Sequence, residues 1–372
     1  MHVLVTTDTL SGVWTHTQEL VSGLVTSGVE VTLVSFGDIP LPAQTSWMET
    51  LSTLDYRPTA FRLDWMQDGQ ADFRDSARYL ASLVKERHPD VLHLNHLCYG
   101  GLPVRTPRLV VAHGDLISWW RSVHGCEPKD SRWLRGYKFL VTQGLEQATT
   151  VVAPSFWMLE TIRSYYAHPK QDAVIYNGRN PVFFNPYVSK QDSVLAVGRF
   201  HDASKQLALL TQHAHPVPVC IVDSDGPMAG PNAPISTDVK VQAKEASVSL
   251  KGMQTEVQLR MLYSRAAIFA ATSCYEPSGY GTLEAALSRC AIVANDIPHF
   301  RELWGDAAIY FRANDAESLA EVIRRLHERR DLCRGYAARA YQRARQCFTA
   351  KRMVDEYLRI YRHMLGQEAV AA

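Results

Sequence analysis

Short runs of β-branched and apolar residues alternate along this chain with longer stretches in which apolar residues recur every three or four positions. The first pattern is typical of buried strands and the second of helices that cover a sheet. In the first half, strands are predicted at residues 3–6, 29–35, 91–94, 108–112, 150–152 and 173–176. Helical stretches such as 73–87 separate most of them, which favours a parallel sheet with helices on both faces.

The alternation stops at residues 176–181, where Asn, Gly and Pro cluster in a way that is typical of a linker. It then restarts, with strands predicted at residues 193–197, 218–222, 248–250, 267–270 and 291–293. We therefore expect two α/β domains, at residues 1–180 and 188–350, joined by a linker at 181–187. A length of 372 residues agrees with two domains of roughly 150–200 residues each.

Residues 351–372 are predicted to form a separate C-terminal helix. Met353, Tyr357, Ile360, Tyr361 and Met364 recur at helical spacing and make one apolar stripe. This stripe has to be buried, either on its own domain or on the first one.

Composition narrows the class of protein. Hydrophobic residues make up 46% of the chain and the formal net charge is +1, so the chain is an ordinary globular protein with no basic excess for a nucleic-acid partner. Seven cysteines without C-x-x-C spacing favour a reduced, cytoplasmic setting over a disulfide or zinc framework. The longest apolar runs, such as 266–271, are too short to cross a bilayer, so we expect peripheral membrane contact at most.

Residues 272–284 carry the most chemical information. The segment follows a predicted strand and leads into a helix, which places residues 278–282 at a strand-to-helix turn. Gly279 and Gly281 allow a ligand to approach the backbone, and the N–H groups of a helix start favour a phosphate. Glu276 and Glu284 flank the turn, and carboxylates suit sugar or ribose hydroxyls. A glycine turn before a helix is common in α/β proteins, so the paired carboxylates strengthen the prediction.

A second candidate is the loop after the predicted strand 193–197, which carries Arg199 and Lys205. Ligands of open α/β sheets bind at the carboxyl ends of strands, so both cations are placed to neutralise a diphosphate. The alternative is two surface cations. The nearby Asp223 and Asp225 have the D-x-D spacing of a metal site, but we interpret them as a turn and expect no metal ion.

Two weaker candidates follow strands of the first domain. Gly12 lies in a turn with only one glycine, which disfavours a dinucleotide cofactor. His113 ends another strand, where a histidine can bind a sugar hydroxyl or a phosphate or serve only the structure. Trp119 and Trp120 suit a sugar or lipid surface, although tryptophan pairs are more often part of a core.

Together these motifs resemble the family-four retaining glycosyltransferases of bacterial type, which have the GT-B fold. The most specific element is the E-x7-E signature from Glu276 to Glu284, followed by the Arg199 and Lys205 pair and by the turn at Asn177. The resemblance implies two Rossmann-like domains that face a cleft, with the C-terminal helix crossing back to the first domain.

The resemblance also implies the roles of individual residues. Arg199 and Lys205 would hold the donor diphosphate, Glu284 the ribose and Glu276 the sugar, while His113 would contact the transferred sugar. The implied donor site comprises Gly12, Arg199, Lys205, Glu276, Ser278, Gly279, Tyr280, Gly281, Thr282 and Glu284. The implied catalytic residues are His113, Glu276, Arg199 and Lys205, and the acceptor side comprises His16, Asp115, Trp119 and Trp120. Ser278 and Tyr280 depart from the residues common in the family.

The expected activity is retaining transfer of a hexose from a nucleotide diphosphate sugar, with UDP favoured over GDP and without a metal or cofactor. The acceptor is a small molecule, a saccharide or a lipid-linked sugar. Two alternatives remain open: a sugar-nucleotide epimerase on the same fold, and a non-catalytic protein that binds a sugar nucleotide.

Overall fold

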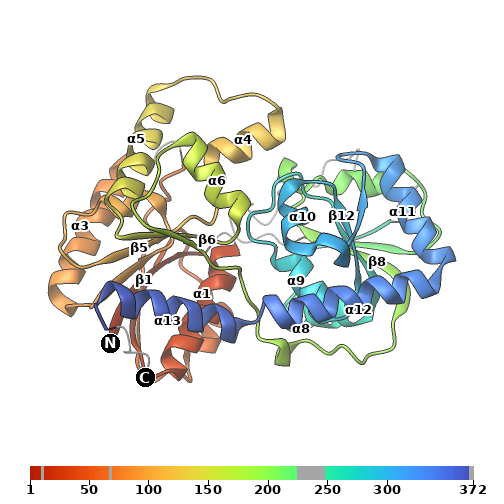
Figure 1. Cartoon of the computed structure of the whole chain (residues 1–372), viewed down its shortest axis with the longest axis horizontal. Coiled ribbons are helices and arrows are strands. Elements are labelled where there is room, and N and C mark those ends of the chain that lie inside the picture. Colours follow the sequence, from red (N-terminus) through yellow and green to blue (C-terminus); the bar gives the residue numbers. More distant parts are fainter. Residues whose placement is uncertain (10–11, 67–68, 224–247, 368–372) are drawn as a thin grey trace. The chain divides into compact units, whose positions relative to one another are not determined.

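The computed structural model describes residues 1–9, 12–66, 69–223 and 248–367. The chain divides into two compact units. Unit 1 consists of Met1–Arg121, Cys126–Gly178 and the segment that begins at Ala350, and unit 2 consists of Ser122–Gly125 and Arg179–Thr349. Each unit contains a parallel sheet with helices on its faces (Figure 1), which confirms the predicted α/β fold class.

Unit 1 contains a seven-stranded parallel sheet in the order β3-β2-β1-β4-β5-β6-β7. Its strands are β1 (His2–Asp8), β2 (Glu30–Phe36), β3 (Leu54–Pro58), β4 (Val91–Leu94), β5 (Arg108–Val111), β6 (Thr150–Ala153) and β7 (Asp172–Val174). The helices in this part of the chain are α1 (Gly12–Thr26), α2 (Pro42–Thr45), α3 (Gln70–Arg87), α4 (Leu116–His124), α5 (Arg132–Gln147) and α6 (Phe156–Tyr165), with short 3-10 helices η1 (Ser46–Met48) and η2 (Leu97–Gly101).

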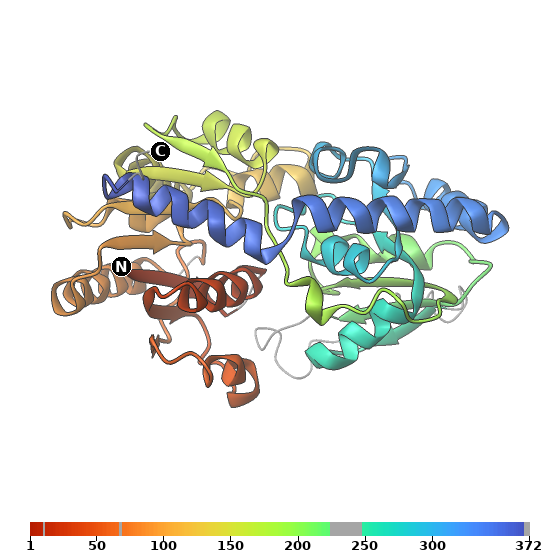
Figure 2. The same cartoon turned by 60° about the horizontal axis from the view of Figure 1, so that its bottom comes forward.

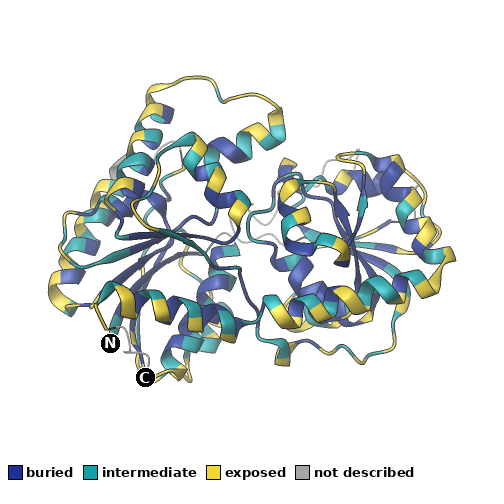
Figure 3. Cartoon of the chain, viewed as in Figure 1, coloured by how far each residue is buried: buried dark blue, intermediate teal, exposed yellow. Residues whose placement is uncertain are grey.

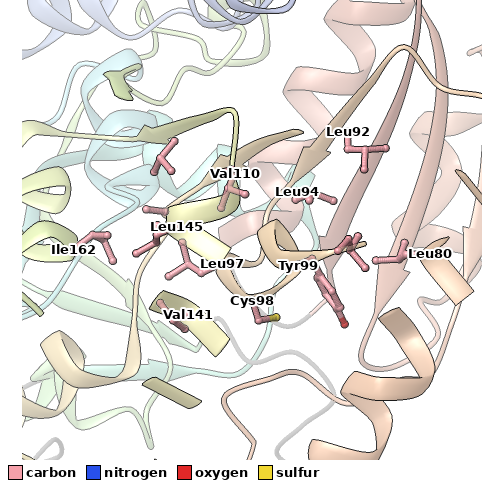
Figure 4. Packing of buried hydrophobic residues seen from close by; sticks show 14 of the residues in the cluster. Leu80, Leu92, Leu94, Leu97, Cys98, Tyr99, Val110, Val141, Leu145 and Ile162 are labelled. Carbon is pink, nitrogen blue, oxygen red and sulfur yellow. The ribbon is translucent and has the colours of Figure 1, made fainter. Parts of the chain in front are cut away.

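Alternating residues of the strands in unit 1 build two cores, one on each face of the sheet. Val3 and Val5 of β1 pack into one core and Leu4 into the other, because successive side chains of a strand point to opposite faces. Figure 4 shows part of the second core, in which Leu94 and Val110 of the sheet lie near Val141 of α5. Figure 3 shows the same arrangement as buried strands beneath helices that are exposed on their outer sides.

The C-terminal helix α13 (Ala350–Met364) covers the first of these cores beside α1, as Figures 1 and 2 show. Met353, Tyr357 and Tyr361 of its predicted stripe are buried, while Ile360 and Met364 pack at the edge of the same cluster. The stripe is therefore buried on unit 1.

Unit 2 contains a six-stranded parallel sheet in the order β10-β9-β8-β11-β12-β13. Its strands are β8 (Gln191–Gly198), β9 (Val219–Asp223), β10 (Val248–Lys251), β11 (Ala266–Ala271), β12 (Ala291–Asn295) and β13 (Ile309–Phe311). Its helices are α8 (Glu256–Arg265), α9 (Tyr280–Leu287), α10 (Pro298–Trp304), α11 (Ala316–Glu328) and α12 (Arg330–Cys347), with 3-10 helices η3 (Pro181–Phe183), η4 (Ala203–Lys205), η5 (Leu207–Thr211) and η6 (Gly305–Ala307).

Strand order determines where a ligand site forms in each unit. The chain winds outward in one direction from β1 and in the other from β4, so the order of unit 1 reverses between these two strands. In unit 2 the reversal lies between β8 and β11. Loops at the carboxyl ends of two such strands diverge, and ligands of open α/β sheets bind at this point.

Two strands depart from the sequence analysis, which predicts neither β3 nor β13. Both lie at sheet edges, and they span only five and three residues. β3 is only half-buried and carries Asp55, Arg57 and Pro58, and β13 is only three residues long, so neither makes a clear apolar run. Among the described residues, no helix is long and apolar enough to span a membrane.

Candidate functional site

In unit 2, the two loops that the sequence analysis singles out lie side by side at the strand-order reversal. The hydroxyl of Thr272 donates a hydrogen bond to the carbonyl of Lys205, at 2.6 Å, and the N–H of Cys274 donates to the carbonyl of Ser204, at 2.8 Å. These bonds join the loop after β8 to the loop after β11. Lys205 of the first loop is thereby brought to the carboxylate of Glu276 in the second.

Lys205 and Glu276 form an ion pair, with Nζ and Oε2 separated by 2.6 Å and the two side chains 19% and 17% exposed. Glu276 also accepts hydrogen bonds from the hydroxyl of Ser273, at 3.1 Å, and from the N–H of Gly279, at 3.2 Å. Burial opposes ionisation of Glu276, but the Lys205 ammonium and these donors hold its pKa below the usual value. Glu276 is therefore ionised, and its carboxylate is held in place by Lys205, Ser273 and Gly279.

Arg199 is held within its own loop. Its guanidinium pairs with Asp202, at 2.9 Å, and the other carboxylate oxygen of Asp202 accepts bonds from the N–H and hydroxyl of Ser204. Burial opposes ionisation of Asp202, but the Ser204 bonds and the Arg199 charge keep its pKa below the usual value. The carboxylate of Asp202 thus shapes the turn and positions Arg199.

The predicted strand-to-helix turn ends at Gly279, and α9 begins at Tyr280. Gly279 has φ of +67°, a conformation that costs other residues about 1–2 kcal/mol. The first N–H groups of a helix have no acceptor within the helix, so a helix start such as that of α9 favours an anion. Gly281 has a packing role as well, because an added Cβ would lie 3.3 Å from the ring of Phe269.

Three further donor-site residues lie around this turn. Ser278 is half-buried, whereas Tyr280 and Thr282 are buried. The hydroxyl of Thr282 donates to the carbonyl of Gly279, at 2.8 Å, and stabilises the first turn of α9.

Glu284, predicted to contact a ribose, is buried in α9 and pairs with Arg179, whose Nε lies 3.0 Å from its Oε1. The same guanidinium donates a hydrogen bond to Glu256 of α8, at 3.1 Å. Burial raises the pKa of Glu284, although the Arg179 charge opposes this shift. Arg179 therefore links the linker region to the helix that carries the second glutamate of the signature.

In unit 1, His113 follows β5 and is buried against Asn95, which directly follows β4 at the strand-order reversal. Its Nε2 lies 2.9 Å from the side-chain oxygen of Asn95, and the same oxygen lies 3.0 Å from Nε2 of His93. His16 of α1 packs edge-on against His113, with ring centroids 4.5 Å apart. Burial lowers the pKa of His16 to about 4 and that of His93 to about 3, and it also lowers that of His113.

Two residues predicted for the acceptor side, His16 and Asp115, are buried in unit 1. The side chain of His16 is fully buried, and its Nδ1 lies 3.2 Å from the side-chain oxygen of Asn177. Asp115 is buried at the start of α4, where one oxygen accepts bonds from the N–H groups of Ile117 and Ser118, both at 2.9 Å. The acceptor contacts expected of His16 and Asp115 stay predictions, and in the structure both side chains are buried.

Trp119 and Trp120 lie in α4, both half-buried, with ring centroids 6.3 Å apart. Gly12 begins α1, but residues 10 and 11 of the same turn lie outside the described part of the chain. Asp223 ends β9, and residue 225 of the D-x-D spacing also lies outside the described residues. Within the described part, no three His, Cys, Asp or Glu side chains are grouped to hold a metal ion.

Four residues of these sites are not among those predicted from the sequence: Asp202, Arg179, His93 and Asn95. Asp202 precedes Ser204 by two positions, a spacing typical of an aspartate that closes a turn onto the backbone. Asn95 directly follows a predicted strand, where polar residues of α/β sheets gather, so this signal was available. Nothing in the sequence pairs Arg179 with a glutamate 105 positions later.

Comparisons with known proteins find similar proteins over most of the chain. The model "Glycosyltransferase Family 4" matches residues 10–183, and the model "Glycosyl transferases group 1" matches residues 191–329. An alpha-maltose-1-phosphate synthase of Mycolicibacterium smegmatis is 27% identical, and the match covers 73% of this chain and 75% of that protein. The O-antigen chain mannosyltransferase RfbU of Salmonella typhimurium is 23% identical over 52% of this chain and 55% of its own.

Solved structures share the fold over nearly the whole chain. The complex of Anabaena Alr3699/HepE with UDP-glucose superposes with a TM-score of 0.75 at 17% identity, covering 97% of this chain and 99% of that one. The sucrose-phosphate synthase of Thermosynechococcus elongatus gives a TM-score of 0.76 at 15% identity, covering 99% and 100%.

Proposed function

The chain belongs to the family-four glycosyltransferases and has the GT-B fold, and from this premise we propose that it transfers a hexose from a UDP-sugar to an acceptor with retention at the anomeric carbon. We further propose that the reaction needs no metal ion or cofactor. The acceptor is a small molecule, a saccharide or a lipid-linked sugar, and a cytoplasmic location and peripheral membrane contact stay predictions.

One observation carries this proposal: two cations and a helix start meet at the strand-order reversal of unit 2. Lys205 is oriented by Glu276 and Arg199 by Asp202, and α9 begins at the end of the loop that carries Glu276. Such an arrangement suits a diphosphate, because charge-assisted hydrogen bonds from two cations and the helix dipole act on one group.

The named relatives support a hexose and a uridine nucleotide. A maltose-1-phosphate synthase and a mannosyltransferase are named for products or groups that contain hexoses. The Anabaena protein was solved in complex with UDP and glucose and with UDP-glucose. In the proposed complex, Glu284 accepts hydrogen bonds from the ribose, and Glu276 and the backbone of residues 279–281 bind the sugar.

The proposed mechanism relies on stabilisation of the leaving group. The bond between the anomeric carbon and the diphosphate oxygen breaks, and Arg199 and Lys205 stabilise the charge that develops on that oxygen. The acceptor hydroxyl attacks the same face of the sugar and gives its proton to the departing phosphate. His113 holds a hydroxyl of the transferred sugar during this step, so the protein contributes positioning and electrostatics.

This proposal is tested by binding and by turnover. Thermal shift with UDP-glucose, UDP-N-acetylglucosamine, GDP-mannose and ADP-glucose should give the largest shift for a UDP-sugar, since ligand at about 100 times its Kd adds about 2.7 kcal/mol of stability. We expect Arg199→Ala and Lys205→Ala to lower the transfer rate by about a hundredfold, since each removes one donor to the developing charge.

The exposed Arg329 is a matched control, because it pairs with Asp331 and its neighbours His327 and Arg330 contact Asp192 at the amino end of β8, opposite to the two loops. Arg329→Ala should leave both binding and turnover unchanged. A transfer rate that stays within a few-fold of wild type in Arg199→Ala and Lys205→Ala would contradict the proposed leaving-group role. Formation of an epimer from the donor alone would contradict transfer itself.

A further inference from the structure

Asn95 is the centre of a buried hydrogen-bond network in unit 1. Its side-chain nitrogen donates to the backbone carbonyl of Thr6, at 2.7 Å, and more weakly to the hydroxyl of Thr17, at 3.4 Å. Its side-chain oxygen lies within 3.0 Å of Nε2 of both His93 and His113. The residue is 5% exposed, so water does not replace these partners.

The carbonyl of Thr6 determines which way the amide of Asn95 is oriented. A backbone carbonyl only accepts hydrogen bonds, so the Asn95 atom at 2.7 Å from it has to be the NH2 group. The hydrogen bonds of Thr17 fit this orientation. Its hydroxyl donates to the hydroxyl of Thr7, at 2.9 Å, so its oxygen can accept from the NH2 group of Asn95. The Asn95 oxygen must then face the two imidazoles.

This orientation in turn determines where both histidines carry their protons. An amide oxygen only accepts, so Nε2 of His93 and Nε2 of His113 each have to donate to Asn95. Burial lowers the pKa of both rings, so each ring is neutral and carries a single proton. Nδ1 of His93 accepts a hydrogen bond from the hydroxyl of Tyr361, at 2.6 Å, so both ring nitrogens of His93 have a partner.

Nδ1 of His113 is left with a lone pair and no hydrogen-bond partner among the described residues, although the atom is buried. A neutral imidazole nitrogen without a proton accepts hydrogen bonds and cannot donate to a phosphate. The group that satisfies it is therefore a donor, such as a sugar hydroxyl.

We propose that Asn95 is a positioning residue, which holds His113 in the Nε2–H tautomer so that Nδ1 accepts a hydroxyl of the transferred sugar. This inference rests on the proposed function for the identity of the ligand, but the tautomer follows from the network alone. Of the two ligand groups that the sequence leaves open for His113, the geometry selects the hydroxyl over the phosphate.

Nitrogen-15 NMR of the histidine rings tests the tautomer in the full chain at neutral pH without a ligand. Long-range proton–nitrogen correlations should show His93 and His113 protonated at Nε2. Asn95→Leu replaces the amide with an apolar side chain of similar size and so removes the acceptor. We expect this variant to give a mixture of tautomers at His113. Tyr361→Phe is the matched control, because it removes a hydrogen bond from the same network and leaves Asn95 in place; His113 should stay protonated at Nε2.

Kinetics with UDP-glucose as the probe separate positioning from a purely structural role. Asn95→Leu should lower kcat/KM by about tenfold, the value of one hydrogen bond, while the affinity for UDP stays unchanged. The double variant Asn95→Leu/His113→Ala should lose no more than His113→Ala alone, because Asn95 acts through His113.

Three results would overturn the proposal: a wild-type His113 protonated at Nδ1, a folded Asn95→Leu chain with an unchanged His113 tautomer, or additive losses in the double variant. The wild-type spectrum decides the question even if Asn95→Leu does not fold. A chain that binds no nucleotide sugar contradicts the proposed function, and the tautomer measurement still decides on Asn95.

Discussion

At the scale of single residues, the charges of the donor side come in pairs. The pairs are Lys205 with Glu276, Arg199 with Asp202, and Arg179 with Glu284. A partner at hydrogen-bond distance keeps each cation oriented before a ligand arrives, which is how a site stabilises a transition state without reorganising.

Lys205→Met should leave Glu276 without its counter-charge in a site where both side chains are less than a fifth exposed. We expect the pKa of Glu276 to rise and the free energy of unfolding at pH 7 to fall by about 1–3 kcal/mol. Urea unfolding of Lys205→Met, Glu276→Gln and the double variant measures the coupling, which should have a similar size. Additive losses would show that the pair contributes nothing to stability.

At the scale of elements, α13 belongs to the core of unit 1 through its contact with α1. Gly23 of α1 lies where an added Cβ would come within 2.5 Å of Val354 in α13, closer than two carbon atoms approach without displacement. The glycine inside this helix is therefore explained by the close approach of α13, and helix propensity alone would favour alanine by about 1 kcal/mol.

Gly23→Ala separates these two effects, because propensity and packing predict opposite signs. We expect the variant to lower the free energy of unfolding by about 1–3 kcal/mol, the usual cost of overpacking. Val354→Ala removes the methyl groups that the new Cβ would meet, so the double variant should be more stable than the sum of the single changes predicts. A stabilising Gly23→Ala would mean that α13 does not pack closely on α1.

At the scale of the whole molecule, buried histidines are unequally divided between the units. Burial lowers the pKa of His16, His93, His96 and His113 in unit 1 and of His215 and His299 in unit 2. A lowered pKa means that the folded state stays neutral where the unfolded state binds a proton, so acid favours unfolding.

We expect the stability of unit 1 to fall as the pH falls below about 6.5 and to level off near pH 3–4, where His93 and His16 titrate in the folded state. Each such histidine adds up to about 1.4 kcal/mol per pH unit to this slope. Pulse proteolysis between pH 7.5 and 4.5, with the cleaved peptides assigned to each unit, should show unit 1 opening first. His93→Gln should reduce the slope, and a flat profile for unit 1 would contradict neutral buried histidines.

Much of the fold could be predicted from periodicity. Eleven of the strands lie within two residues of their predicted ends, because β-branched runs such as 91–94 and 291–293 are buried on both faces. The glycine turn at residues 278–282 could also be located, since a strand before it and a helix after it leave few alternatives. The short edge strands β3 and β13 could not, because their local signal is weak.

Much less of the site could be predicted from the sequence. Lys205 and Glu276 were both identified as ligand residues, but their pairing depends on β8 and β11 being neighbours in the sheet. His16 is predicted for the acceptor side, and only the structure shows that α1 directs its ring into the interior. The number of residues between two groups does not reveal this, because the direction of a side chain depends on how its helix packs.

The sequence by itself determined the chemical groups and the local elements that carry them: the two glutamates eight positions apart, the cations after a strand and the apolar stripe of the last helix. Only the tertiary structure decided which of these groups meet, where α13 packs, and that Asn95 sets the proton on His113. The physical reason is that propensity and periodicity act over neighbouring residues, whereas strand order and burial join residues far apart in the chain and determine their partners and their pKa values.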